Sequence, residues 1–285
     1  MQDDSVHPLH PAGPAVLLCT VRNCGLPLAA GPSHFRCASG HTFDRARRGW
    51  VNLLQPQDRR SRVPGDSRAA ALARRRLVAR GIEAPLHRHL LAQVTELEVA
   101  RPAVLDVGCG EGSALAFLAE RRPIDAHGVD LSAEAIDLAA MQLPRALWVV
   151  ANADRGLPFA AASFDLAMSL LARRPVTELA RVLRPGGRLL VAVPAPDDLA
   201  ELREVVQGAA TARDRLGPIA AELAADFELV GRERCADRLA LDRPALDDLL
   251  AASYRGARAA ERARFADVER LEVTSARDVG CFRRR

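Results

Sequence analysis

Short apolar runs alternate with amphipathic stretches through the second part of the chain. The apolar runs are AVLDVGC (103–109), AHGVDLS (126–132), ALWVVAN (146–152), FDLAMSL (164–170) and RLLVAVP (188–194). The stretches between them have helical periodicity over 112–122, 133–142 and 176–183. Strands that alternate with helices form crossover units, which place neighbouring strands parallel in one sheet. The pattern therefore predicts an α/β fold with a mostly parallel sheet.

The regions on either side of these runs have other patterns. Between Ser67 and about Leu97 two helical stretches are separated by Gly81, a suitable C-cap residue. After the last run the pattern predicts a helix near 197–207, a strand near 227–234, a helix at 244–253 and a long strand near 269–283. We expect a loose leader over 1–15, a small Cys/His domain over 16–45, a basic connector with helices over 46–98, and a large α/β domain over 99–285.

Composition places the chain among soluble globular proteins. Its 285 residues are 49% hydrophobic and 27% charged, enough for one large domain with a small one beside it. No run of 18 apolar residues is present, so no membrane span is predicted. The first residues contain acids and prolines where a signal peptide needs basic and apolar ones. We expect a cytoplasmic protein without a membrane partner.

The positive charge is concentrated in one segment. The net charge is only +4, but eleven arginines and three acids lie between Asp44 and Arg80, and the chain has no lysine. A guanidinium makes planar bidentate contacts with phosphate, so the cluster favours RNA binding, although any single arginine can equally be solvated surface. The candidate RNA contacts are Arg45, Arg47, Arg48, Arg59, Arg60 and Arg62, with Trp50 as a candidate for base stacking. Trp50 can equally be a core aromatic that closes the small domain onto the large one.

Four potential metal ligands stand near the start of the chain. Cys19 and Cys24 are followed after twelve residues by Cys37 and His41. Two pairs of soft or borderline ligands on two turns are typical of a zinc ribbon, in which bound Zn²⁺ supplies the stability that so small a core lacks. The first pair is spaced C-x4-C where C-x2-C is usual. Two alternatives stay open: a ribbon that holds little metal, and a ribbon that uses another ligand such as His34.

A glycine-rich turn follows the first predicted strand. LDVGCGEG places Asp106, Gly108, Gly110 and Gly112 between a strand and a helix, where glycines let the backbone approach a ligand. The dinucleotide fingerprint would have a further glycine at Ser113. Asp130 closes the next strand about twenty residues on, where an acid accepts hydrogen bonds from ribose. The glycines can also serve packing alone, and Asp130 can be a helix N-terminal acid.

These motifs together resemble those of the class I S-adenosylmethionine-dependent methyltransferases. VLDVGCGEG resembles their first motif, GVDLS their second, and LPFAAASFDLAMS the segment around their fourth strand. ARVLRPGGRLLVAVP is similar to the helix, turn and fifth strand that follow. The resemblance covers about 103–195. It implies a Rossmann-like domain with a mostly parallel seven-stranded sheet and S-adenosyl-L-methionine as cofactor.

The resemblance also implies roles for individual residues. In that family the glycine loop lies under the methionine part of the cofactor, and the residue at Asp130 binds ribose. The residues that follow the third strand flank the adenine, whereas Asp165 is expected to brace the sheet. The expected cofactor-binding residues are therefore Asp106, Gly108, Gly110, Gly112, Asp130, Leu131, Asn152 and Ala153.

A narrower resemblance comes from the basic segment. CxxGHTFDRARRGWVNLL, followed by GDSRAAALARRRLVARGIEAPL and a methyltransferase domain, resembles the RlmA-type 23S rRNA guanine-N1 methyltransferases, which include macrolide-resistance enzymes. That family places a zinc module before the catalytic domain and methylates N1 of a guanine in a hairpin loop of 23S rRNA. The resemblance implies this substrate, with a small-molecule methyltransferase and a non-catalytic zinc-dependent RNA-binding protein as the alternatives.

One loop departs from the family pattern. LLARRP (170–175) stands where relatives carry an aromatic-Ala-Pro stretch near the methyl group and the incoming base. We expect Leu171 and Arg173 to lie near the transfer site and to influence base stacking or the choice of target. The catalytic group that accepts the guanine N1 proton is not identified by the sequence, and the oligomeric state, including a homodimer, stays open.

Overall fold

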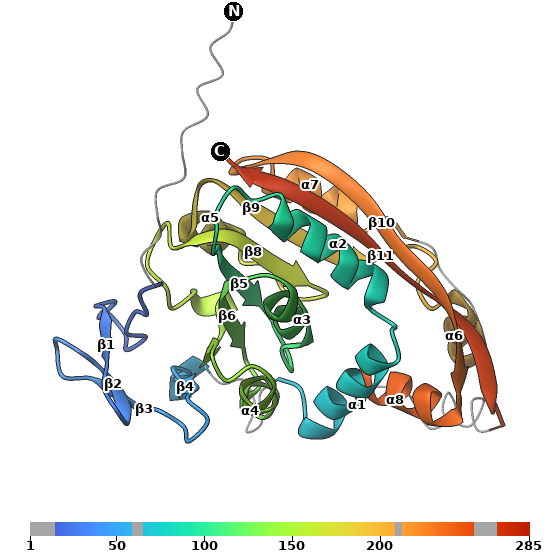
Figure 1. Cartoon of the computed structure of the whole chain (residues 1–285), viewed down its shortest axis with the longest axis horizontal. Helices are drawn as coiled ribbons and strands as arrows, with labels where there is room; N and C mark the ends of the chain where they lie inside the picture. Colours follow the sequence, from blue (N-terminus) through green and yellow to red (C-terminus); the bar gives the residue numbers. More distant parts are fainter. Residues whose placement is uncertain (1–14, 59–64, 209–212, 254–266) are drawn as a thin grey trace, which may run out of the picture.

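The computed structural model describes residues 15–58, 65–208, 213–253 and 267–285. Its centre is a parallel sheet made of the five predicted apolar runs, and these strands are almost wholly buried. They are β5 (Ala103–Val107), β6 (Asp125–Asp130), β7 (Leu147–Val150), β8 (Phe164–Leu170) and β9 (Leu183–Pro194). The spatial order β9-β8-β5-β6-β7 places the reversal of strand order between β5 and β8 (Figure 1). In such sheets ligands bind at the carboxyl ends of the strands beside this point.

Two long strands continue the sheet in antiparallel fashion. β11 (Arg270–Arg284) pairs with β9, and β10 (Phe227–Asp242) pairs with β11. These two complete the seven strands expected after residue 102 and confirm the predicted Rossmann-like class. The sequence placed a strand only near 227–234, whereas β10 runs eight residues further because β11 pairs with it as far as Asp242.

The connector adds an eighth strand that the sequence did not predict. β4 (Val51–Asn52) pairs parallel with β7, and the backbone N–H of Leu53 donates to the carbonyl of Val150 at 2.9 Å. Val51 is completely buried. The sequence did not predict this strand, because two residues are too few to show an alternation of apolar and polar positions. It fixes the basic segment to one edge of the sheet.

Helices cover both faces of the sheet (Figure 1). One buried cluster joins α2 (Ala84–Thr95), α3 (Ser113–Arg121) and α4 (Ala133–Gln142) to one face. A second joins α5 (Val176–Val182) and α7 (Leu216–Leu223) to the other face, together with apolar residues of the N-terminal domain such as Phe35 and Phe43. The sequence pattern did not predict α7. The small domain shares the core of the large one.

The remaining helices pack near the turn between the two connector helices. α1 (Arg68–Ala79) ends before Gly81, whose φ of +92° confirms the predicted break. Leu77 of α1 packs with α6 (Ala200–Gln207) and α8 (Arg243–Ser253) in a third buried cluster. Among the described residues no helix is long and apolar enough to cross a bilayer.

The N-terminal domain contains three short antiparallel strands at one side of the molecule (Figure 1). They are β1 (Leu28–Ala30), β2 (His34–Cys37) and β3 (Thr42–Asp44). Two single-turn 3₁₀ helices, η1 (Pro56–Asp58) and η2 (Ala153–Arg155), lie after β4 and β7.

Candidate functional site

The glycine loop joins β5 to α3 at the carboxyl edge of the sheet. The backbone N–H groups of Gly108 and Cys109 both donate to the carbonyl of Val129, at 2.8 and 3.1 Å, which folds the loop against β6. Gly108 has a φ of +78°, and a Cβ there would lie 2.5 Å from the Cβ of Ala172. A Cβ on Gly112 would lie 2.6 Å from Cη2 of Trp148. Both conformation and space therefore require glycine at these positions.

Asp130 closes β6 directly beside this loop. Its carboxylate accepts hydrogen bonds from the backbone N–H of Gly110 at 2.9 Å and of Ser132 at 2.8 Å. Ser132 is the N-cap of α4, so Asp130 also lies as an acid beside this helix N-terminus, the alternative that the sequence left open. Burial raises the pKa of Asp130. A carboxylate has further acceptor sites, so Asp130 can hold the loop and still accept from ribose hydroxyls.

Asp106 offers an unused acceptor inside the same site. The side chain is buried, and no donor among the described residues reaches its Oδ1. Burial, with the charges of Asp130 and Glu111, raises the pKa of Asp106 to about 8. An orphaned buried carboxyl oxygen is costly unless a ligand satisfies it. The site thus fits the ammonium group of a bound amino acid, as S-adenosylmethionine carries.

The residues expected at the adenine lie at the end of the neighbouring strand. The backbone N–H of Ala151 donates to the carbonyl of Asp130 at 3.0 Å, so the ends of β6 and β7 adjoin. Asn152 caps η2, because its Oδ1 accepts from the backbone N–H of Asp154. Its Nδ2 donates to the carbonyl of Asp58 at 3.2 Å. Ala153 begins η2, and Leu131 packs partly buried against the core. The structure brings these residues to one edge with Asp130.

The connector helix α1 also reaches the glycine loop, a contact that the sequence pattern does not predict. Arg74 Nη2 donates to Asp66 at 2.8 Å, and its Nη1 lies 3.8 Å from Glu111 Oε2. Arg75 instead donates to the carbonyl of Leu138, and Arg76 pairs with Asp248. Three successive helical positions point about 100° apart, so the divergence of these arginines follows from helix geometry.

The four Cys/His residues converge in the N-terminal domain. Their ligand atoms all lie within 4.8 Å of one another. The Sγ atoms of Cys24 and Cys37 are 3.8 Å apart, and Nδ1 of His41 lies 3.5 Å from Cys19 Sγ and 3.4 Å from Cys37 Sγ. Tetrahedral Zn²⁺ with bonds of about 2.0–2.3 Å separates its ligands by about 3.4–3.8 Å. The cluster therefore fits Zn²⁺ despite the C-x4-C spacing, and His34 is not part of it.

The buried thiols of the cluster have pKa shifts of opposite sign, and burial raises the pKa of Cys19 to about 12. Burial acts to raise the pKa of Cys37, but hydrogen bonds from the backbone of His41 and Ser39, and contacts with Cys24 and Cys19, lower it to about 7. Thiolates are the form that binds Zn²⁺.

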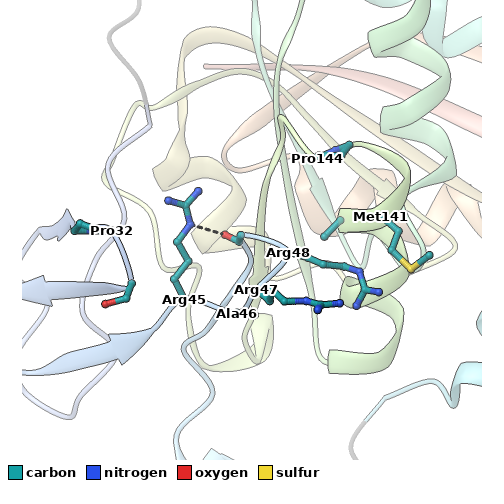
Figure 2. A pocket seen from close by; sticks show the side chains of 10 residues that line it. Pro32, Arg45, Ala46, Arg47, Arg48, Met141 and Pro144 are labelled. Carbon is teal, nitrogen blue, oxygen red and sulfur yellow. Dashed lines mark hydrogen bonds between the residues drawn. The ribbon is translucent and has the colours of Figure 1, made fainter.

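An open groove lies between the N-terminal domain, the connector and α4. Its volume is about 760 Å³, and it is lined by Pro32, Ser33, the segment 45–49, Ala140, Met141 and Pro144. Figure 2 shows Arg45, Arg47 and Arg48 between Pro32 on one side and Met141 and Pro144 on the other. All three arginines are exposed. Arg59, Arg60 and Arg62 lie outside the described residues.

Three of the described candidates in the basic segment have partners inside the chain, the first being Arg45, whose Nε donates to the carbonyl of Gly49 at 3.3 Å. Arg48 Nη1 donates to both carboxylate oxygens of Asp137, at 2.9 and 3.0 Å. The indole N–H of Trp50 donates to the same carboxylate at 3.2 Å, and the ring packs half-buried against the core. These contacts favour the structural role of Trp50 over base stacking. Among the described arginines of the segment, they leave Arg47 best placed for an RNA phosphate, with Arg45 beside it in the groove lining.

A second pocket lies at the carboxyl ends of β8 and β9. Its volume is about 390 Å³, and its lining includes Leu171, Arg174, Pro194, Arg213, Arg215 and Ile219. Leu171 is exposed, with a φ of +57°. Arg174 Nε is buried and has no hydrogen-bond partner among the described residues. Arg173, which the sequence predicts near the transfer site, directs its guanidinium to Asp154 at 3.3 Å. The neighbouring Arg174 was missed because sequence alone does not show which of two adjacent arginines turns inward.

Asp165 fulfils the structural role expected of it. It is buried, accepts from the backbone N–H of Ala103 at 2.8 Å and forms an ion pair with Arg184. The contacts join β8, β5 and the start of β9.

Comparisons with known proteins agree with this geometry. Residues 104–187 match a family described as "Methyltransferase domain", and residues 19–62 match the zinc-ribbon family "RlmA, N-terminal". The chain is 38% identical over 234 residues to the 23S rRNA (guanine(748)-N(1))-methyltransferase of Streptomyces fradiae, covering 80% of this chain and 82% of that protein. It is 33% identical to a putative 23S rRNA (guanine-N(1)-)-methyltransferase of Micromonospora griseorubida, covering 82% and 84%. A similarly named Bacillus subtilis protein is 32% identical, covering 65% and 67%.

Proposed function

The chain belongs to the 23S rRNA (guanine-N1-)-methyltransferase family, and from this premise we propose that it transfers a methyl group from S-adenosylmethionine to N1 of a guanine in a hairpin loop of 23S rRNA. The observation that carries the proposal is the attachment of an arginine-lined groove and a zinc-type cluster to the sheet edge of a methyltransferase site. A methyltransferase for small molecules has no need of such a groove.

The described residues divide the work of cofactor binding. Asp130 would accept from the ribose hydroxyls and hold Gly110, and Asp106 would accept from the ammonium group. The glycine loop lets the backbone approach the methionine part. When bound, S-adenosylmethionine supplies an electrophilic methyl group on a sulfonium centre. The protein contributes positioning and exclusion of water, which suffice for much of the rate increase in such a displacement.

The pocket at β8 and β9 is the proposed acceptor site. It lies at the carboxyl ends of the strands beside the glycine loop, and Ala172 in its lining contacts Gly108. Leu171 offers an apolar surface for a base, and Arg174 places a guanidinium in the lining as a donor for a carbonyl oxygen such as O6 of guanine. A base in a hairpin loop must be splayed out to enter. Such a pocket selects among bases by the donor and acceptor pattern of their edges.

The Zn²⁺ ion would have a structural role. The cluster supplies four protein ligands, which leaves no open position for substrate. Cys19 and Cys37 are buried, and their domain packs on the main core. The metal would therefore hold the turn at Pro32 and Ser33 in place as one wall of the groove. Homodimerisation, a cytoplasmic location and a role in macrolide resistance stay predictions.

The test is methyl transfer to RNA from a strain that lacks the modification. The protein is incubated with labelled S-adenosylmethionine and total rRNA, and the label is followed into separated RNA species with and without ribonuclease. We expect label only in the large-subunit rRNA. Label in another RNA species would assign the enzyme to a different RNA, and absence of label from all RNA would contradict the proposed rRNA substrate.

A further inference from the structure

Arg74 is the one member of its arginine triplet that turns toward the glycine loop. Arg75 and Arg76 are directed to α4 and α8. A Cβ added to Gly110 would lie 3.2 Å from Arg74 Nη1, so the guanidinium is in contact distance of the loop backbone. The arginine therefore lies over the segment on which the methionine part of the cofactor is expected to rest.

Carboxylates surround this guanidinium. Asp66 accepts from Nη2 at 2.8 Å, whereas Glu111 is 3.8 Å from Nη1, too far for a hydrogen bond. Glu111 is buried, and its Oε1 is engaged by the hydroxyl of Ser113 at 2.6 Å. The charge of Arg74 also acts to lower the pKa of Asp130. Arg74 thus contributes positive charge to a site that is otherwise acidic, and its side chain is 36% exposed.

The cofactor has two opposite charges at its amino-acid end. Asp106, with an orphaned Oδ1, fits the ammonium group. The carboxylate needs a donor of the other sign, and a guanidinium binds carboxylates through parallel hydrogen bonds. We propose that Arg74 binds the carboxylate of S-adenosylmethionine, so that the connector helix α1 forms part of the cofactor site. The proposal rests on the S-adenosylmethionine site described above.

The surroundings of Arg74 hold it in place before the cofactor arrives. The segment that precedes α1 contacts the loop after β6, because Ser132 Oγ donates to the carbonyl of Asp66 at 2.5 Å. A Cβ on Gly65 would lie 2.7 Å from the backbone nitrogen of Ser132. α1 is further attached to α8 by the ion pair of Arg76 with Asp248. Preorganisation of this kind lowers the entropic cost of binding.

The experiment compares two cofactor analogues by calorimetry, without RNA. S-adenosylhomocysteine carries both the ammonium and the carboxylate, and its decarboxylated form keeps only the ammonium. We expect Arg74→Ala to weaken S-adenosylhomocysteine binding by about 10- to 100-fold, the range expected for loss of a charge-assisted hydrogen-bonded pair. Binding of the decarboxylated analogue should change less than about 2-fold on that scale.

The neighbouring arginine provides the matched control. Arg75→Ala removes the same side chain one position along α1 and should leave both affinities at the wild-type value. Circular dichroism of both variants checks that the chain is folded. An equal loss for both analogues in Arg74→Ala would show that Arg74 only supports the loop, and no loss for either would also overturn the proposal.

The binding assay separates this proposal from the proposed function. It uses no RNA, so its outcome is independent of which nucleotide or molecule is methylated. Absence of S-adenosylhomocysteine binding to the wild-type protein would overturn both the cofactor site and the role of Arg74. If the wild-type protein binds S-adenosylhomocysteine more tightly than the decarboxylated analogue and Arg74→Ala does not, the role of Arg74 in carboxylate binding is supported. This holds even if rRNA is not the substrate.

Discussion

At the scale of single residues, the site combines positions that the sequence makes visible with others that it hides. The glycines and Asp130 are visible because their chemistry follows from their place after a strand. Arg74 and Arg174 are hidden because each stands beside other arginines. Only the three-dimensional direction of each side chain separates Arg74 from Arg75 and Arg174 from Arg173. Residue type predicts the chemistry of a site, and packing determines which of two neighbouring arginines takes part in it.

The carboxyl group of Asp106 predicts a pH dependence of cofactor binding. Its pKa of about 8 keeps it mostly protonated at neutral pH in the free protein. An ammonium group beside it favours the ionised form, so binding at about pH 7 should release about one proton. Affinity should therefore rise with pH up to about 8 and then level off.

Calorimetry in buffers of different ionisation enthalpy measures this proton release. Asp106→Asn should abolish it and weaken S-adenosylhomocysteine binding. The same proton release in the variant would assign the titration to another group.

Removal of the Asp130 carboxylate should damage the site in two ways. The ribose loses its acceptor, and the backbone N–H of Gly110 loses the oxygen that fixes the loop. We expect Asp130→Ala to lower the affinity for S-adenosylhomocysteine by at least about 30-fold, measured by calorimetry. Retained affinity would mean that the ribose lies elsewhere.

At the scale of elements, hydrophobic periodicity predicted a helix or strand correctly where that element buries one regular face. The runs of β5 to β8 and the pattern of α4 correspond closely to the observed strands and helix. It failed for β4, which has two residues, and for α7, whose LGPIAAEL contains Gly and Pro. The extension of β10 to Asp242 depends on pairing with β11, a contact between distant segments. Such elements depend on contacts with distant segments, so the local sequence pattern does not predict them.

The zinc-type cluster makes a prediction for the N-terminal domain. Cys24→Ser replaces one of the four ligands, so zinc content measured by atomic absorption should fall from about one ion per chain to well below it. The melting temperature should fall too, because Phe35 and Phe43 join the common core.

A cysteine outside the cluster is the control for this variant. Cys235→Ala in β10 should leave the zinc content unchanged. Full zinc content in Cys24→Ser would exclude that residue as a ligand.

At the scale of the whole molecule, the candidate RNA groove and the acceptor pocket occupy different parts of one sheet. The groove lies by β4 and α4, and the pocket lies at the ends of β8 and β9. The glycine loop stands between them in strand order. An RNA held in the groove must therefore extend across the cofactor site to present its base. β4 attaches the segment that follows the zinc-type cluster to this edge of the sheet.

The groove predicts a salt-dependent contribution to RNA binding. Arg47→Gln should weaken binding of the rRNA hairpin and reduce the slope of log K against log salt by about 0.7–0.9, as loss of one phosphate contact does. Filter binding over a series of salt concentrations measures both quantities.

The control for the groove lies near the opposite edge of the sheet, on the strand that pairs with β10. Arg283→Gln removes an exposed arginine of β11 that pairs with Glu228. It should leave the salt slope unchanged. Equal effects of both variants would show that net charge, and not the groove, binds the RNA.

The most direct test of the account is the position of the methyl group. 23S rRNA treated with the protein and S-adenosylmethionine is digested to nucleosides for mass spectrometry, and a second portion is copied by reverse transcriptase. N1 of guanine lies on the pairing edge, so its methylation blocks copying at one nucleotide. We predict 1-methylguanosine and a single new stop within a hairpin loop. Methylation at another atom, or stops spread over many sites, would contradict the account.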